Sequence, residues 1–216
     1  MVLEELRTLW QQRQKRQYSF RYVLRTFLFI FLYDLVRFVP TPIGEFLRYG
    51  LLKCFCKKIQ SIWIRAGTLF FHPEGISIGR HVSINDNVFI NGYGEVEIGD
   101  DVRIGYGTAI VSEDHALDDL ETPIWKQPKL KGKVTIQNNV WVASGVRILR
   151  GVTIGEGSVI GAGSVVTRSF PPYSIVAGNP ARVVRYRKPL ETPRTRHAVQ
   201  GAQGNESGIS DEPHKR

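Results

Sequence analysis

The amino-acid sequence predicts an all-β solenoid, in which short parallel strands stack coil upon coil around one continuous apolar core. The first observation is a six-residue repeat of aliphatic residues, found at Ile78, Ile84, Ile90, Ile98, Ile104, Ile110, Ile136, Val142, Ile148, Ile154, Ile160 and Val166. The second is a small or β-branched residue two positions before each repeat residue, which puts both side chains on one strand face. The third is a Gly or Asn directly after seven of the twelve, residue types that accept left-handed or otherwise awkward backbone angles at a corner.

A six-residue unit of this kind cannot bury its apolar face alone, so coils spaced about 4.8 Å apart must stack to build the core. A sandwich of short antiparallel strands would instead show turn signals about every 8 to 12 residues, which is longer than the observed repeat. Two interruptions separate groups of repeat residues: a short one at Gly92–Glu95 and a long loop at residues 114–133. We expect the repeat domain to span residues 67–188.

The N-terminal region, residues 1–66, is basic, with 12 Lys and Arg against 4 Asp and Glu. It predicts a polar helix over residues 3–17, an aromatic-rich helix over residues 18–39, and a third helix that starts at Thr41–Pro42 and runs toward Ile59. Charged residues interrupt every apolar run that could span a membrane, and no signal-peptide pattern is present. An apolar face flanked by basic residues fits an anionic membrane surface, whereas the same face could cap the open end of the solenoid or pack between subunits.

Other features of the ends exclude several classes of protein. Nucleic-acid binding is not expected, because no recognised nucleic-acid motif accompanies the positive charge. Cys54 and Cys56 are too few and too close for a disulfide framework or a cysteine-type zinc site, which indicates a reducing, cytoplasmic compartment. Residues 189–216 lack periodicity and bulky apolar residues, so they predict a disordered tail.

Residues 68–188 resemble the hexapeptide-repeat acyltransferases, most specifically through the stretch NNVWVASGVRILRGVTIGEGSVIGAGSVVTRSFPPYSIVAGNPARVVR at residues 138–185. The resemblance implies a left-handed parallel β-helix with three sides to each coil, and the repeat residues then form about four coils. It also implies acetyl-CoA as the cosubstrate, no required metal, and a homotrimer whose active sites lie between subunits.

His115 stands at the head of the long loop, where a rigid scaffold can hold a catalytic group. A lone histidine is more often structural, but the resemblance implies that His115 is the general base that takes a proton from the acceptor hydroxyl or amine. Glu113 and Asp114 are expected to be solvated loop charges, because adjacent side chains on an extended chain diverge. Asn91 matches an asparagine that helps to bind the acceptor in sugar acetyltransferases of the family, and the alternative is a corner residue of an Asn-Gly turn.

The resemblance also implies the residues that contact the cosubstrate. Trp141 corresponds to a tryptophan near the active site on the acceptor side, and Ser144 to a serine near the thioester that could stabilise a developing oxyanion. Ala162 stands where a small residue meets the pantetheine arm. The positions near the anionic end of the cosubstrate are Thr167, Arg168, Arg182 and Arg185, of which Arg168 replaces a lysine. Ordinary solvated surface is the alternative for these arginines.

The leading functional hypothesis is therefore an acetyl-CoA-dependent O-acetyltransferase that acts on a saccharide or glycan intermediate, at the cytoplasmic face of a membrane if the N-terminal region binds lipid. Alternatives are an N-acetyltransferase for an amino sugar and an acetyltransferase for serine or an antibiotic hydroxyl. A γ-type carbonic anhydrase needs three histidines around a metal, and no second histidine closely follows His115. A non-catalytic hexapeptide scaffold would not require both His115 and the basic residues at the cosubstrate end.

Overall fold

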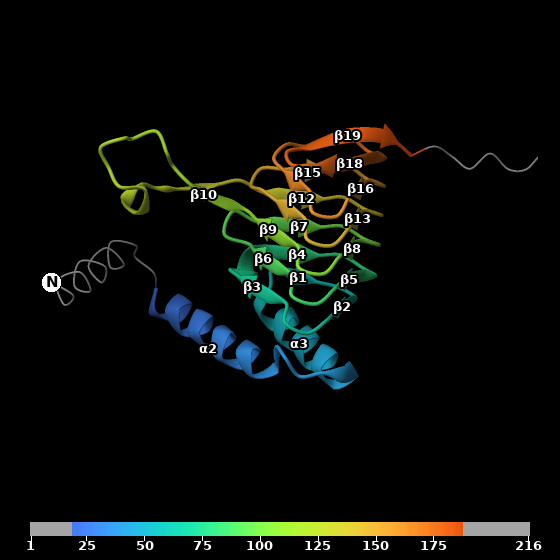
Figure 1. The fold of residues 1–216 in the computed structure, drawn as a ribbon. Coiled ribbons are helices and arrows are strands. Elements are labelled where there is room, and N and C mark those ends of the chain that lie inside the picture. Colours follow the sequence, from blue (N-terminus) through green and yellow to red (C-terminus); the bar gives the residue numbers. More distant parts are fainter. Residues whose placement is uncertain (1–18, 188–216) are drawn as a thin grey trace, which may run out of the picture.

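A computed structural model describes residues 19–187 of the chain and shows a parallel β-solenoid with two helices at its N-terminal end (Figure 1). The solenoid fold predicted from the six-residue repeat is confirmed. The helix predicted over residues 3–17 and the tail predicted from residue 189 lie outside the described residues.

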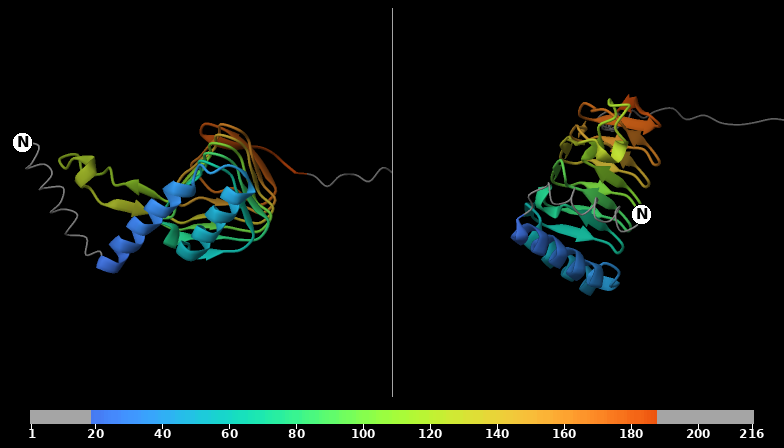
Figure 2. Two further views of the ribbon diagram at one scale, coloured as in Figure 1. Left: turned by 90° about the horizontal axis from the view of Figure 1, so that it is seen from below. Right: turned by 90° about the vertical axis from the view of Figure 1, so that its left-hand side faces the viewer.

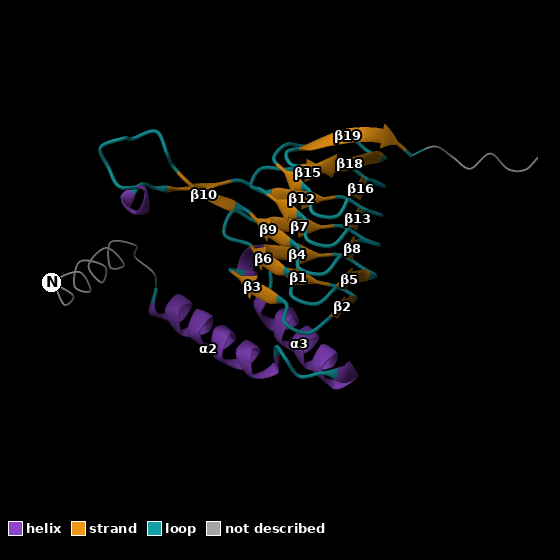
Figure 3. Cartoon of the chain, viewed as in Figure 1, coloured by secondary structure: helices purple, strands orange, loops and turns teal. Residues whose placement is uncertain are grey.

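The solenoid has three faces, each a stack of hydrogen-bonded strands (Figure 3). The first face contains β1 (Lys58–Ile59), β4 (Ile76–Ile78), β7 (Val96–Ile98), β12 (Val134–Ile136) and β15 (Thr153–Ile154). The second face contains β2 (Ile62–Ile64), β5 (Val82–Ile84), β8 (Arg103–Ile104), β13 (Trp141–Val142), β16 (Val159–Ile160), β18 (Ser174–Gly178) and the antiparallel β19 (Ala181–Tyr186). The third face contains β3 (Leu69–Phe71), β6 (Phe89–Asn91), β9 (Ala109–Val111), β14 (Arg147–Ile148) and β17 (Val165–Val166).

The predicted repeat residues form the core. All twelve are at most 2% exposed, and the residues two positions before them are buried as well. Parallel pairing places like residues above one another, so that Ile78, Ile98, Ile136 and Ile154 form one column on the first face. Each buried isoleucine contributes about 2 kcal/mol of hydrophobic stabilisation, and the column repeats that contribution from coil to coil.

The coil count differs from the four that the repeat predicts. Five full coils are present, and Phe170 and β18 begin a sixth, in which Phe170 bridges to Ile154. The first coil escaped the pattern because only five positions separate its inward residues Ile59 and Ile64. The third predicted helix also ends early, at Phe55, because Ile59 pairs with Ile78 in the first face.

The corners work differently from the sequence-based expectation. The left-handed residue is the third after a repeat residue, as at His81 with a φ of 55° and Asn139 with a φ of 56°. Where the residue directly after the repeat residue is a glycine, the next coil approaches it closely. A Cβ on Gly105, for example, would lie 2.5 Å from the backbone nitrogen of Ser144. Glycine at this position therefore provides space rather than backbone freedom.

The helices α2 (Phe20–Val36) and α3 (Thr41–Phe55) cover one end of the solenoid (Figure 2). Phe29, Tyr33 and Leu52 belong to the same buried cluster as the strands, and the Tyr33 ring meets Phe70 of the first coil edge-on at 5.8 Å. The buried Arg48 joins the parts, because its guanidinium donates hydrogen bonds to the backbone carbonyls of neighbouring segments. The interpretation of this region as a cap is thus confirmed for its inner side.

A hairpin that leaves the solenoid positions the candidate site. The chain leaves the corner between the third and first faces after β9 and forms a hairpin of β10 (Glu113–His115) and β11 (Lys129–Lys131), which projects from the solenoid in Figure 1. Short 3-10 turns occur at η1 (Pro73–Gly75) and η2 (Ile124–Lys126). None of the helices within residues 19–187 has both the length and the apolar character required to cross a bilayer.

Candidate active site

The hairpin presents His115 on a face that carries four polar side chains. Antiparallel pairing puts Glu113 opposite Lys131, and His115 opposite Lys129. Directly opposed residues point to the same side, and so do residues two apart on one strand, so all four side chains share one face of the hairpin. The Nδ1 atom of His115 is shielded from solvent and has no hydrogen-bond partner among residues 19–187. This imidazole lacks the orienting acceptor that catalytic histidines ordinarily have within one chain.

Glu113 holds the base of the hairpin. Its carboxylate accepts hydrogen bonds from the ammonium of Lys129, at 2.9 and 2.8 Å, and from Nδ2 of Asn91, at 2.9 Å. Burial raises the pKa of Glu113, but the hydrogen bonds from Lys129 and Asn91 outweigh it and hold the pKa below its usual range. The expectation of a solvated loop charge was wrong for Glu113, whose side chain is only 15% exposed.

Asn91 has its side-chain amide engaged inside the corner after β6. Its Oδ1 accepts a hydrogen bond from the backbone N–H of Tyr93 at 3.0 Å, while its Nδ2 donates to Glu113. Only 6% of the residue is exposed. The corner interpretation is confirmed, and Asn91 positions the hairpin through Glu113; its role in acceptor binding stays a prediction.

Trp141, predicted on the acceptor side, and four of the residues predicted to contact the cosubstrate form two neighbouring columns. On the outer side of the second face, Trp141 pairs with Val159, which pairs with Ile175, which pairs with Arg185. Trp141 and Arg185 are both exposed at opposite ends of this column. The column therefore presents an aromatic surface at one end and a cation at the other, with two aliphatic residues between them.

The second column runs along the corner between the second and third faces. The carbonyl of Ser144 accepts a hydrogen bond from the N–H of Gly163 at 2.9 Å, which stacks the corner of Ala162 directly above that of Ser144. Ala177 packs on Gly161 one level higher, and Arg182 pairs with Ala177 across the antiparallel strands. The result is a ridge of small, exposed side chains with Arg182 at its upper end.

Thr167 and Arg168 lie elsewhere, at the corner between the third and first faces, where the hairpin also leaves the solenoid. One coil below them, Arg150 lies 3.7 Å from the carboxylate of Asp114. Among residues 19–187, no carboxylate lies within ion-pair distance of Arg168, Arg182 or Arg185. The predicted site residues thus form two groups on different edges of one chain.

The structure also adds residues that the sequence did not reveal. The ring of Tyr93 lies beneath the ammonium groups of Lys131 and Lys129, at 4.3 and 5.4 Å, so it supports the same face of the hairpin. In the sequence, the only signal for this hairpin face was the two-residue spacing of charged residues on either side of the loop, Glu113 with His115 and Lys129 with Lys131. Within residues 19–187, no three His, Cys, Asp or Glu side chains come together as a metal site would require.

Comparisons with known proteins find several similar chains. Residues 133–168 match the family model of the bacterial transferase hexapeptide (six repeats). The chain is 37% identical over 129 residues to a probable acetyltransferase of Mycobacterium tuberculosis. The aligned region covers 58% of this chain but only 43% of that relative. The chain is also 37% identical over 144 residues to the galactoside O-acetyltransferase of Escherichia coli, and this aligned region covers 64% of this chain and 68% of that relative. A hexapeptide-repeat-containing acetyltransferase of Vibrio cholerae, solved with acetyl coenzyme A, superposes with a TM-score of 0.71 at 29% identity, over 79% of this chain and 91% of that one.

Proposed function

The chain belongs to the hexapeptide-repeat acyltransferases, and we propose that it transfers the acetyl group of acetyl-CoA to a hydroxyl of a saccharide, with His115 as the general base. The observation that supports the proposal is the division of the site: on one edge an imidazole whose Nδ1 is shielded, and on another a ridge of small residues that ends in Arg182, which has no ion-pair partner in the described chain.

The proposed reaction follows from these groups. The neutral imidazole of His115 accepts the proton of the acceptor hydroxyl as its oxygen attacks the thioester carbon, which avoids a free alkoxide. The carbon–sulfur bond then breaks, and the protonated imidazole returns the proton to the leaving thiolate, so that the products are an acetyl ester and CoA. A general base of this kind contributes about 10²- to 10⁴-fold to the rate.

Acetyl-CoA fits the ridge on chemical grounds. A narrow pantetheine arm needs a groove wall without large side chains, as at Ser144 and Ala162, and a phosphorylated nucleotide needs cations, as at Arg182 and Arg185. Arg168 and Thr167 stand on the other edge of the chain and would meet the anionic end from a neighbouring subunit. Trp141 is 56% exposed on the second face, where it would line the acceptor side.

The division of the site between two edges supports a homotrimer in which each active site lies between neighbouring subunits. The His115 hairpin projects away from its own solenoid, so it can reach the ridge of Ser144 and Ala162 on an adjoining chain. A neighbouring chain would also supply the missing partner for Nδ1 of His115. Monomers are then expected to be inactive.

The test is turnover of labelled acetyl-CoA against saccharides, sugar nucleotides and glycolipids, read by mass spectrometry of the acetylated product. His115→Ala is expected to lower kcat by at least about 10²-fold while CoA binding and the fold persist. His81→Ala is the control, because His81 is an exposed histidine at a corner of the solenoid and lies outside the hairpin. Turnover by purified His115→Ala at the wild-type rate would remove the proposed base.

We also propose that the outer side of the helical cap rests on an anionic membrane, which would bring the enzyme to lipid-linked glycans. The exposed large apolar residues of this surface, here termed the cap face, are Phe20, Val23, Leu24, Phe27, Leu28, Ile30, Phe31, Leu35, Phe38, Ile43, Phe46 and Leu47. The basic excess of residues 1–66 is the charge that complements anionic lipid.

Sedimentation with vesicles of anionic or neutral lipid tests the cap face. Phe27 and Phe31 stack on one side of α2 at 6.5 Å, so Phe27→Glu with Phe31→Glu is expected to abolish binding to anionic vesicles, and salt is expected to weaken binding of the wild type. Leu120→Glu is the control, because Leu120 is 93% exposed on the hairpin loop. Unchanged vesicle binding by the double variant would contradict the cap face as the lipid-binding surface. Dissociation of its oligomer would instead indicate that the cap face packs against a second copy of the chain.

A further inference from the structure

The ridge of small side chains ends at one aromatic residue, Tyr106. The corner that contains Tyr106 lies one coil below the corner of Ser144, between the same two faces of the solenoid. Tyr106 is 57% exposed, whereas Ser144 and Ala162 place only small side chains at the two corners above. A large ring therefore stands where the ridge would otherwise continue toward the helical cap.

The three successive corners of this edge share one backbone conformation. Each ends in a glycine with a left-handed φ, of 65° at Gly107, 72° at Gly145 and 68° at Gly163. The N–H of Gly145 donates to the carbonyl of Tyr106 at 2.8 Å. The N–H of Gly163 donates to the carbonyl of Ser144 in the same way, at 2.9 Å. Because the backbones match and stack, the side chains that precede these glycines leave the edge in the same direction, one above the other at the coil spacing of about 4.8 Å.

The corner of Tyr106 is also fixed relative to the corner above it. The guanidinium of Arg147 donates to the carbonyl of Gly107 at 2.7 Å and to that of Gly145 at 3.2 Å, so it joins the two corners on the outside. The buried hydroxyl of Thr108 donates a further hydrogen bond to the backbone of the upper corner, at 3.1 Å. Contacts on both sides of the coil wall therefore set the position of Tyr106.

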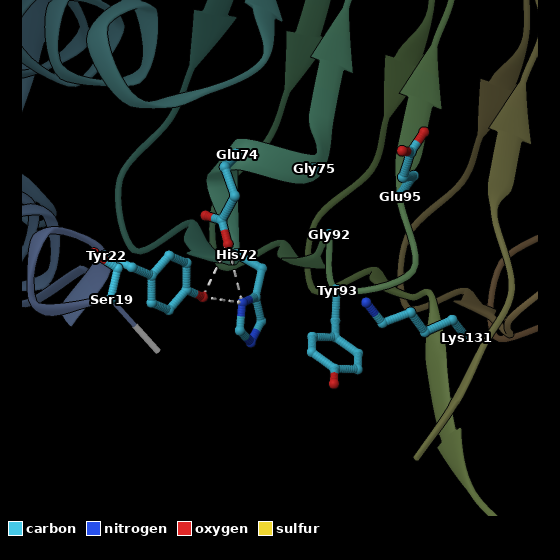
Figure 4. Close-up of a pocket in the computed structure, with 9 residues that line it drawn as sticks. All are labelled: Ser19, Tyr22, His72, Glu74, Gly75, Gly92, Tyr93, Glu95 and Lys131. Carbon is cyan, nitrogen blue, oxygen red and sulfur yellow. Dashed lines mark hydrogen bonds and ion pairs between the residues drawn. The ribbon is translucent and has the colours of Figure 1, made fainter. Parts of the chain in front are cut away.

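An open pocket elsewhere on the chain does not extend this edge. Its walls come from the start of α2, the η1 turn, the corner after β6, and β11 (Figure 4). The η1 turn and the corner after β6 belong to the edge between the third and first faces, where Tyr93 and Lys131 border the open space. A ligand that continues down the ridge of Ser144 therefore meets Tyr106 and not this pocket.

We propose that Tyr106 limits the length of the acyl group that the enzyme accepts, an inference that rests on the proposed function and its placement of acetyl-CoA along the ridge. The anionic end lies at Arg182, the pantetheine arm passes Ala162, and the thioester lies beside Ser144. The acyl group then points down the ridge toward Tyr106. Carbon atoms in contact stand about 3.5 to 4.0 Å apart, so a coil spacing of about 4.8 Å leaves room for a methyl group above the ring but not for a longer chain.

The experiment measures the binding of acetyl-CoA and butyryl-CoA to the full-length protein by isothermal titration calorimetry, which requires no acceptor. Tyr106→Ala is the test variant, because alanine already stands at Ala162 in a corner of the same backbone conformation. Tyr106→Phe is the matched control, because it keeps the ring and removes only the hydroxyl. Circular dichroism and native mass spectrometry check the fold and the assembly of each variant.

For the wild type we expect butyryl-CoA to bind at least about tenfold more weakly than acetyl-CoA, because pockets discriminate a single methylene group by about 10- to 200-fold. In Tyr106→Ala the dissociation constants of the two thioesters should come within about twofold of each other, mainly through tighter binding of butyryl-CoA. Tyr106→Phe should discriminate as the wild type does. A gain in binding confined to the longer thioester would not result from a general loss of folding.

The results that would overturn the inference can be told apart from failure of the proposed function. If the wild type binds both thioesters with equal affinity, or if Tyr106→Ala discriminates as strongly as Tyr106→Phe, Tyr106 does not limit the acyl group and the proposed function stands. If the wild type binds neither thioester, the proposed function and the role of Tyr106 both fail.

Discussion

Glu113 is the residue whose environment departs most from what its sequence neighbours suggest. It sits at the base of the hairpin, where Lys129 and Asn91 donate to its carboxylate. Because these hydrogen bonds hold its pKa below the usual range in the folded chain, the ionised carboxylate stabilises the fold above the carboxyl range of unfolded chains. That stabilisation is lost as the pH falls through the lowered pKa.

We therefore expect Glu113→Gln to lower the free energy of unfolding by on the order of 1 kcal/mol near pH 7, and the difference from the wild type to be smaller at about pH 3, below the usual carboxyl range. Thermal unfolding at the two pH values measures it. Glu97→Gln is the control, because the Glu97–Lys133 pair is about half exposed on both sides and should contribute only a few tenths of a kcal/mol. If both variants lose the same free energy of unfolding at pH 7, or if the loss for Glu113→Gln does not change with pH, the ionised Glu113 carboxylate does not stabilise the hairpin as argued.

At the scale of residues, the sequence predicted the core residues that recur at the six-residue spacing and missed the contacts made by residues outside that repeat. Ile104 and Val142 could be assigned to the core because each belongs to a run of identical spacing. The contact between Glu113 and Lys129 depends on the antiparallel register of a hairpin whose loop has no period, and adjacent positions gave no hint that Glu113 would turn inward. The roles of the proposed site residues came from family resemblance rather than from spacing.

At the scale of elements, α3 contains two glycines in opposite situations, and they provide a matched test of how the cap packs. A Cβ on Gly44 would collide with the carbonyl oxygen of Val39 and lie 2.8 Å from Nη1 of Arg48, the side chain that joins the cap to the first coil. Gly50, in the same helix, has open space around it. The helix therefore passes closest to its neighbours at Gly44.

We expect Gly44→Ala to destabilise the protein by about 1 to 3 kcal/mol, because the clash displaces Arg48 from its carbonyl partners. Gly50→Ala should stabilise it by about 0.5 to 1 kcal/mol through helix propensity alone. Urea unfolding at one fixed protein concentration measures both changes. A stabilising Gly44→Ala would mean that α3 does not pack against the segment at Val39 in solution.

The elements also show where local patterns are sufficient and where tertiary contacts override them. The strands β4 to β9 and β12 to β17 follow the six-residue repeat, so they were predictable. The segment at Lys58–Ile59 looked like the end of a helix, yet it forms β1 because Ile59 completes the Ile column of the first face. One missing residue between β1 and β2 was enough to hide the first coil.

At the scale of the whole molecule, the residues of the proposed site lie on two edges of one chain that do not meet. The His115 hairpin leaves the corner between the third and first faces, while Ser144 and Ala162 lie on the corner between the second and third faces. Closed rings of identical subunits bring such unlike edges together, because each chain offers one edge to each neighbour. A closed ring such as the proposed trimer would bring the two edges of the proposed site together.

Subunit complementation tests the arrangement. His115→Ala removes the proposed base from one edge, and Ala162→Trp fills the ridge on the other, so homotrimers of either variant should be inactive. Co-expression with two different affinity tags, followed by purification on both, isolates rings that contain both variants. Every such three-membered ring has one interface with an intact His115 facing an intact Ala162, so activity should return to about one third of the wild-type value. If native mass spectrometry confirms the mixed rings and they remain inactive, His115 and Ala162 do not form a site between two subunits.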